Sequence, residues 1–280
     1  MIEIGIHQKL IILRHTSVGL YLGDQEEEED VLLPNKYCPT DYEIDDEIEV
    51  FVYLDYAERK VATTLQPKIL LYQFALLRVT TVSEVGAFMD WGLEKELLVP
   101  FKEQKKNLEE NRWYIVYLDL DVKTDRLYAS NRLERFLQND NLTVAEGEEV
   151  DLIIMKKTDL GFTTIINNRH EGLLFESDVH QDLNIGDKVT GYIKTVREDN
   201  KIDLSLNPIG YTNFIDPAMD VVYQKLQANK GFLPFTDKSH PDDIKDKFNL
   251  SKKAFKKALG GLYKQRKIVM EDNGIRISND

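Results

Sequence analysis

At its most informative point the chain reads Val82-Ser-Glu-Val-Gly-Ala-Phe-Met-Asp-Trp-Gly-Leu-Glu-Lys-Glu-Leu-Leu-Val-Pro100. An apolar strand pattern over residues 74–82 leads into Gly86, and glycine suits a sharp bend because it has no Cβ to clash. After the bend, Ala87-Phe88-Met89 is extended again, Asp90-Trp91-Gly92 forms a turn, and Leu97-Leu98-Val99 is a second apolar run. The stretch therefore predicts two strands, joined by a turn, that follow a glycine bend.

The same pattern occurs in two further copies, so the chain contains an internal repeat. The first copy has Gly19, an acidic loop and then Val31-Leu-Leu-Pro34, and the third has Gly161 and then Glu171-Gly-Leu-Leu-Phe175. The three glycines are 67 and 75 residues apart. Each copy continues into a long and then a short predicted strand, at 47–55 and 60–65, at 113–121 and 126–130, and at 187–196 and 201–206.

Five short strands per copy predict a small Greek-key barrel of the OB type, because a closed sheet has no exposed edges. We expect the barrels to span residues 1–66, 67–140 and 141–210. Modules of this size bury a modest fraction of their surface, so the barrels should pack on one another.

The third copy contains four further motifs, which are Gly161-Phe162, Glu171-Gly-Leu-Leu-Phe175, the Gly186-Asp187 turn and Lys201-Ile-Asp-Leu-Ser-Leu206. Together they resemble the S1 RNA-binding domain. The first two copies depart from the S1 pattern. They have Leu-Leu-Pro34 and Leu-Leu-Val-Pro100 where the pattern usually has a histidine.

The C-terminal part, residues 214–280, predicts a winged helix-turn-helix domain. Pro217 can open a helix, Ser251 is a good N-cap, and Asn273-Gly274 is a favoured two-residue turn for a closing hairpin. In order, the predicted elements are a helix from 217 to 228, an extended piece at 232–235, helices at 239–248 and 251–266, and a hairpin at 267–277. The chain is therefore predicted to be mainly β, with three tandem S1-like OB-fold barrels followed by an α+β winged helix-turn-helix domain.

The net charge of −13 opposes nucleic-acid binding, which depends on phosphate neutralisation by lysine and arginine. The charge is unevenly distributed, however, with −17 before Phe214 and +4 from Phe214 onward. The acidic run Glu26-Glu-Glu-Glu-Asp30 is typical of a solvated loop, and it would repel polyanions from its side of the first barrel. The predicted third helix, by contrast, is rich in lysine.

Composition excludes several classes of protein. No apolar run is long enough to cross a bilayer, and the N-terminus lacks the basic start and apolar core of a signal peptide. We therefore expect a cytoplasmic protein without membrane contact. Cys38 is the one cysteine and the five histidines are scattered, so no disulfide and no zinc site is expected. The sequence shows no nucleotide-binding glycine loop and no nucleophile–base pair in context, so we expect neither enzymatic activity nor a cofactor.

The three S1-like repeats, the Leu-Leu-Pro34 and Leu-Leu-Val-Pro100 strand ends and the C-terminal winged helix together resemble one bacterial family, the conserved virulence factor B proteins. The resemblance covers essentially the whole chain in domain order. It implies sequence-tolerant RNA binding and regulation of gene expression after transcription, without catalysis. The expected partner is single-stranded RNA, with duplex nucleic acid as a second partner for the winged helix. We expect a monomer or a weak dimer.

OB-type barrels bind single strands on the face of strands two and three, where aromatic rings stack on bases and basic groups hold phosphates. The stacking position of the S1 pattern corresponds to Tyr21 and Phe88, and in the third repeat to Thr163, a departure that lies beside Phe162. The predicted RNA contacts of the barrels are Tyr21, Lys60, Phe88, Arg126, Phe162, Arg169, His170, Phe175 and Lys201. Those of the winged helix are Lys252, Lys253, Lys256, Lys257, Lys264 and Arg266.

Several of these residues have a structural alternative. Tyr21 and Phe88 either stack on bases or fill the barrel cores, and His170 is either structural or a phosphate contact. Trp91 either exposes its ring or packs between repeats. Strand alternation puts Leu173 and Phe175 on one face without showing which face meets solvent.

Two other functions remain open. A DNA-binding regulator led by the winged helix would prefer duplex DNA. A protein-interaction adaptor on ribosomal or RNA-processing machinery is favoured by the acidity of the first two repeats.

Overall fold

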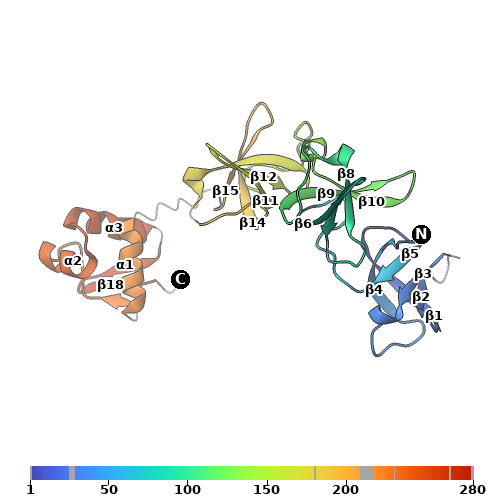
Figure 1. The fold of residues 1–280 in the computed structure, drawn as a ribbon. Coiled ribbons are helices and arrows are strands. Elements are labelled where there is room, and N and C mark those ends of the chain that lie inside the picture. Colours follow the sequence, from blue (N-terminus) through green and yellow to red (C-terminus); the bar gives the residue numbers. More distant parts are fainter. Residues whose placement is uncertain are drawn as a thin grey trace. The chain divides into compact units, whose positions relative to one another are not determined.

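The structure is a computed structural model of the 280-residue chain, and it describes residues 2–24, 29–179, 181–208, 217–229, 231–264 and 266–278. The chain divides into two compact units, Met1–Pro208 and Ile209–Asp280. The first unit contains three five-stranded repeats and the second contains three helices and a small sheet (Figure 1). Most of the predicted acidic loop, and the segment between the two units, lie outside the described residues.

The fifteen strands of the first unit follow the predicted order, and the predicted strands at 113–121 and 126–130 match the observed ones residue for residue. Repeat one contains β1 (His7–Thr16), β2 (Gly19–Gly23), β3 (Asp30–Pro34), β4 (Glu47–Leu54) and β5 (Lys60–Thr63). Repeat two contains β6 (Phe74–Ser83), β7 (Gly86–Asp90), β8 (Leu97–Pro100), β9 (Trp113–Asp121) and β10 (Arg126–Ser130). Repeat three contains β11 (Glu149–Thr158), β12 (Gly161–Ile166), β13 (His170–Phe175), β14 (Lys188–Val196) and β15 (Ile202–Ser205). Short 3-10 helices are η1 (Asn35–Tyr37), η2 (Phe101–Glu103), η3 (Leu133–Arg135) and η4 (Glu176–Asp178).

Repeats one and three are closed barrels with the strand orders β1-β2-β3-β5-β4 and β11-β12-β13-β15-β14. In both, the third and fifth strands close the barrel as a parallel pair. Repeat two has the same connectivity but lacks the closing hydrogen-bonded ladder, so its sheet order is β10-β9-β6-β7-β8. Its strands β8 and β10 nevertheless lie side by side. The predicted fold class is confirmed, and in repeat two the third and fifth strands lie side by side without a hydrogen-bonded ladder between them.

The three repeats share one register, which the glycine at the start of each second strand explains. Gly19, Gly86 and Gly161 have φ angles of 150°, 149° and 142° and pair with the last residue of the third strand. A Cβ on any of them would lie 2.0–2.2 Å from a carbonyl oxygen of that third strand. Only glycine fits such a close approach. The glycine therefore begins the second strand after a tight turn, where the sequence predicted a bend within a strand.

The repeats pack on one another through apolar side chains, as expected from their size. Phe51 of repeat one is fully buried in the core of repeat two, where its ring lies edge-on to Trp91 with 5.7 Å between centroids. Trp91 is 2% exposed, so it packs between repeats and does not present its ring to solvent. A second interface joins repeats two and three, where Phe74 packs with Ile153 and Ile165.

The second unit is a winged helix-turn-helix. Its elements are α1 (Pro217–Ala228), β16 (Phe232–Leu233), α2 (Pro241–Phe248), α3 (Lys252–Lys264), β17 (Ile268–Glu271) and β18 (Gly274–Ile277), and the sheet order is β16-β18-β17. The predicted N-cap is confirmed, because the Ser251 hydroxyl accepts a hydrogen bond from the main-chain N–H of Ala254 at 3.2 Å. Helical spacing buries Val222 and Leu226 of α1 against Phe255 and Leu259 of α3.

The predicted Asn-Gly turn of the wing is wrong by one residue. Glu271 pairs with Gly274, so the two turn residues are Asp272 and Asn273, and Gly274 begins β18. A Cβ on Gly274 would lie 2.3 Å from the carbonyl oxygen of Leu233. The glycine is needed for contact with the neighbouring strand β16, rather than for the turn itself.

Candidate nucleic-acid interface

The stacking position of the S1 pattern lies on the outer face of the second strand. Tyr21 and Phe88 are half-buried, and each stands between two fully buried residues of its own strand, such as Leu20 and Leu22 around Tyr21. Because successive side chains of a strand point to opposite faces, these buried neighbours direct Tyr21 and Phe88 away from the barrel core. The alternative that they fill the cores is therefore wrong.

Cross-strand pairing shows that this position is the same in each repeat. Tyr21 pairs with Leu32, Phe88 pairs with Leu98, and Thr163 pairs with Leu173. Repeat three thus has a half-buried threonine where the other repeats have an aromatic ring.

In repeat one the polar groups of this face are already paired with one another. The Arg14 guanidinium lies 4.0 Å from the centre of the Tyr21 ring and forms an ion pair with Asp30 at 2.7 Å. Lys60 forms an ion pair with Glu29 at 2.5 Å, and its hydrogen bond lowers the pKa of the Glu29 carboxyl. An RNA strand would have to displace these partners.

In repeat two the face is hollowed by a cavity of about 570 Å³. Phe88 and Leu98 line it, and Arg126 stands at the start of β10 beside them. The Arg126 guanidinium forms an ion pair with the Glu58 carboxylate of repeat one. The basic residue that was predicted to hold a phosphate is therefore neutralised from the neighbouring repeat.

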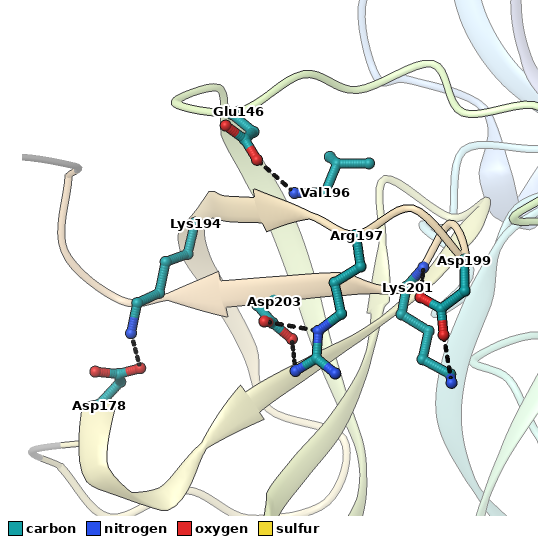
Figure 2. Close-up of polar contacts among 8 residues, drawn as sticks. All are labelled: Glu146, Asp178, Lys194, Val196, Arg197, Asp199, Lys201 and Asp203. Atoms are coloured by element: carbon teal, nitrogen blue, oxygen red, sulfur yellow. Dashed lines mark hydrogen bonds and ion pairs between the residues drawn. The ribbon is translucent and has the colours of Figure 1, made fainter.

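In repeat three the outer face has both an aromatic ring and several cations. Leu174 is fully buried, so Leu173 and Phe175 point outward, which answers the question that alternation left open. The Arg197 guanidinium lies 6.0 Å from the centre of the Phe175 ring and binds the Asp203 carboxylate at 2.9 Å. Figure 2 shows the Arg197–Asp203 ion pair next to Lys201, which binds Asp199 at 2.6 Å.

Two further pairings complete the view of this barrel in Figure 2. Lys194 of β14 binds Asp178 of η4 at 2.7 Å, and Glu146 accepts a hydrogen bond from the main-chain N–H of Val196 at 2.8 Å. A cavity of about 420 Å³ opens on the same barrel and is lined by Thr163, Leu173, Arg197 and Lys201, among others. The third repeat thus brings an apolar surface and exposed basic groups together.

Two predicted contacts are not on this surface. Phe162 is 6% exposed and belongs to the core of repeat three, so it cannot stack on a base. His170 is fully buried, with one ring nitrogen bound to the Thr143 hydroxyl at 2.8 Å and the other to the Gln138 carbonyl. It fixes the connection between repeats and is structural. Arg169, beside it in the turn, is exposed.

The basic side chains of α3 occupy the solvent face of that helix. Lys253, Lys256, Lys257, Lys264 and the following Arg266 are exposed, and Lys252 is half-buried. The opposite face is buried through Phe255, Leu259 and Leu262. Lys256 lies 3.3 Å from the Asp237 carboxylate. In a helix-turn-helix the second helix of the motif contacts nucleic acid, which is α3 here.

Sequence reasoning missed Tyr56 and Arg14. Tyr56 is 77% exposed in the turn after β4 and lines the cavity of repeat two, although it belongs to repeat one. Its local signal was an aromatic ring within the charged turn Asp55-Tyr-Ala-Glu-Arg59. Only the packing of the repeats shows what that ring faces.

Within the described residues, no helix has both the length and the apolar character needed to span a bilayer. The same part of the chain contains no group of three or more histidine, cysteine, aspartate or glutamate side chains arranged to hold a metal ion.

Tandem barrels with this face, joined to a winged helix, define a class of multidomain protein built from nucleic-acid-binding modules. The S1 domain matches residues 4–65, and the CvfB-like winged helix domain matches residues 220–277. The S1 match thus falls on the first repeat, whereas the predicted resemblance rested mainly on the third.

Relatives that align over most of the chain identify its family. Uncharacterized protein YitL of Bacillus subtilis is 30% identical over 276 residues, which cover 96% of this chain and 91% of that protein. Conserved virulence factor B of Staphylococcus epidermidis is 28% identical over 85% of this chain and 82% of its own. Conserved virulence factor B of Staphylococcus aureus is also 28% identical, over 84% and 82%. The chain belongs to the conserved virulence factor B family.

A solved structure also aligns over the whole length. It is a multidomain protein with nucleic acid binding domains from Streptococcus pneumoniae, 24% identical over 98% of each chain, with a TM-score of 0.42.

Proposed function

We propose that the protein binds single-stranded RNA and regulates gene expression after transcription, through binding alone and without a catalytic step. The observation that supports this most directly is the outer face of repeat three. There the Phe175 ring, Leu173 and the cations Arg197 and Lys201 lie on one surface. Bases stack on such rings without regard to sequence, and nearby cations hold the phosphates.

The lysine face of α3 supplies a second basic surface in the same chain. Weak sites on tethered modules act at high effective concentration, so their affinities combine when one strand engages both. The acidity of repeats one and two does not prevent this, because screening limits its range to about 8 Å at physiological salt.

The first test is fluorescence anisotropy with labelled single-stranded RNA, single-stranded DNA and duplex DNA over a salt series. We expect the tightest binding to single-stranded RNA, with an affinity that falls steeply as salt rises because counterions are released. Phe175→Ala should weaken binding about tenfold, since one stacked base contributes about 1–3 kcal/mol. Phe101→Ala is the control for loss of a phenylalanine ring, because Phe101 is exposed and directly follows the third strand of repeat two, whereas Phe175 ends the third strand of repeat three.

The winged helix is tested in the same assay by changing Lys252, Lys253, Lys256 and Lys257 together to alanine. A large loss of RNA affinity supports joint binding by barrels and winged helix. Changing Lys238 and Lys245, which are exposed in the same domain but outside α3, should have a smaller effect.

Other outcomes would identify the alternatives. A preference for duplex DNA that is lost only in the lysine variant would establish a DNA-binding regulator. No binding to any of the three nucleic acids at low salt would overturn the proposal and favour an adaptor. The specific observation for an adaptor is that Lys60 and Arg126, like Arg197 and Lys201, already form ion pairs with carboxylates of the protein.

A further inference from the structure

The cavity on repeat two is lined by residues from two repeats. Repeat two contributes Phe88, Leu98 and Arg126, and repeat one contributes Tyr56 and Glu58, with further residues from both. Its volume of about 570 Å³ lies within the usual range for a small-ligand site. The face that the S1 pattern assigns to RNA is therefore only part of the wall of this cavity.

Hydrogen bonds between repeats one and two hold in place the residues that repeat one contributes to the cavity. The Tyr56 hydroxyl donates to the carbonyl oxygen of Glu94 at 3.0 Å. The Lys95 ammonium donates to the carbonyl oxygens of Leu54 and Asp55 at 2.9 and 2.8 Å. The turn that bears Tyr56 is thus fixed to repeat two before any ligand arrives, which reduces the entropy lost on binding.

The chemistry of the cavity suits a neutral planar group. Four aromatic residues line it, of which Tyr56 is exposed and Phe88 is half-buried, whereas Tyr53 and Trp91 are buried behind them. Four of the nine other lining residues are leucines. Charged groups of both signs lie among them, and Arg126 is paired with Glu58. Such a surface stacks a nucleobase, and it offers no excess of cations that would draw a phosphate inside.

The same arrangement occurs at repeat three. Its cavity of about 420 Å³ is lined by Thr163, Leu173 and Lys201. By register and by sequence these positions correspond to Phe88, Leu98 and Arg126 in repeat two.

The wall of that second cavity again comes from the preceding part of the chain. Leu137 and Asn139, from the connection that follows repeat two, line it. The Asn139 amide bonds to the main chain of Glu171 in both directions, at 2.8 and 2.9 Å, which fixes the connection. In both repeat two and repeat three, the preceding segment of the chain thus contributes part of the cavity wall.

We infer that repeat one completes the RNA site of repeat two, so that one nucleobase of a single-stranded RNA enters the shared cavity and contacts both Phe88 and Tyr56. The adjoining phosphate then takes the place of the Glu58 carboxylate beside Arg126. This inference rests on the proposed function, since it names the second repeat as a place where the same RNA is held.

The chain offers a spectroscopic reporter for this site. It has two tryptophans, and Trp91 lines the cavity whereas Trp113 lines neither cavity. In a Trp113→Phe variant, the tryptophan fluorescence therefore comes from Trp91 alone. Titration with unlabelled single-stranded RNA should quench Trp91, with a midpoint equal to that measured by anisotropy on the same variant.

Substitutions then test the role of repeat one. Tyr56→Ala should weaken RNA binding about fivefold and abolish the Trp91 response, whereas Tyr56→Phe, which keeps the ring, should retain most of both. Glu58→Gln should tighten binding about threefold, because the carboxylate no longer competes for Arg126. Trp113→Ala is the matched control for loss of an exposed aromatic ring and should leave affinity unchanged.

Different results would overturn the proposed RNA binding and the site shared by repeats one and two. If the unmodified protein binds no RNA, the proposed function is overturned and this site with it. If it binds RNA but Tyr56→Ala and Glu58→Gln match it in affinity and Trp91 does not respond, the shared site is overturned while RNA binding stands.

Discussion

The ring of Phe51, on β4 of repeat one, lies edge-on to the indole of Trp91 in repeat two, with 5.7 Å between the ring centroids. Tyr53, two residues further along the same strand, makes a second edge contact with Trp91 at 6.3 Å. All three rings are buried. The face of β4 that points away from its own barrel therefore belongs to the core of the next one, and the two repeats support each other.

Removing the indole should destabilise the first unit strongly. Trp91→Ala leaves a cavity among Phe51 and Tyr53, and truncation of a buried tryptophan costs about 3–5 kcal/mol. Urea unfolding followed by circular dichroism measures this loss. Trp113→Ala, a change of the same size at a side chain that is 55% exposed, should cost less than about 1 kcal/mol. Equal costs for the two changes would contradict the packing described here.

The glycine that begins each second strand should tolerate no side chain. Gly161→Ala would place a Cβ 2.2 Å from the Leu174 carbonyl oxygen at a φ of 142°, so we expect loss of the folded third repeat. Gly260→Ala is the matched control, because this helical glycine has open space around its Cβ position. It should raise the stability of the winged helix by about 0.5–1 kcal/mol. Separate thermal transitions of the variants, monitored by calorimetry, distinguish the two outcomes.

Glu29 should make repeat one sensitive to acid. The hydrogen bond from Lys60, supported by the main-chain N–H of Ile2, lowers the pKa of Glu29 below its ordinary value of 4.5. A depressed carboxyl pKa stabilises the folded state above about pH 4.5, and this contribution is lost as the pH falls through the folded-state pKa.

Glu29→Gln should therefore lower the free energy of unfolding by about 0.5–1 kcal/mol at pH 7, a small effect because the pair is partly exposed. The difference between the variant and the unmodified protein should shrink as the pH falls through the folded-state pKa of Glu29. Denaturant unfolding at pH 7 and at a series of lower pH values is the measurement, with Glu49→Gln on the exposed side of β4 as the control. A difference that does not shrink as the pH falls would show that the carboxylate charge is not its source.

Thr163 offers a gain-of-affinity test. It holds the register position of Phe88, so Thr163→Phe should add a stacking ring to the outer face of repeat three. We expect single-stranded RNA to bind about tenfold more tightly, in line with the contribution of one stacked base. Thr158→Phe, at the end of β11, changes the same residue type on a different strand and should not reproduce the gain. Unchanged affinity in Thr163→Phe would place the RNA elsewhere.

The fold was predictable because its strongest local signals agree with one another. Each glycine at the start of a second strand is followed directly by an apolar residue that the core buries. Pro217 and Ser251 mark the starts of helices that the structure contains. The turn of the wing was misplaced because an Asn-Gly pair is a common turn signal. Gly274 is instead required by contact with Leu233, a residue distant in sequence.

The candidate site was less predictable, because burial depends on which face of a strand the barrel encloses. Phe162 follows the glycine of the S1 pattern. The pattern does not show which face of the strand the barrel encloses, and the structure shows that the Phe162 side chain points into the core. His170 lies in a turn by sequence and is buried by the connection that packs over it. Tyr56 has its role only through the docking of two repeats, which no local pattern encodes.

Because Phe51 and Tyr53 of repeat one lie in the core of repeat two, the repeats are not independent folding domains. A fragment beginning at residue 67 would match the sequence boundary between repeats, yet it would leave Trp91 and Leu97 without the side chains that cover them. Such a fragment should aggregate, whereas one beginning at Met1 keeps that core closed. In this chain the repeat unit of the sequence is therefore shorter than the cooperative unit of folding, because the cores of neighbouring repeats share side chains.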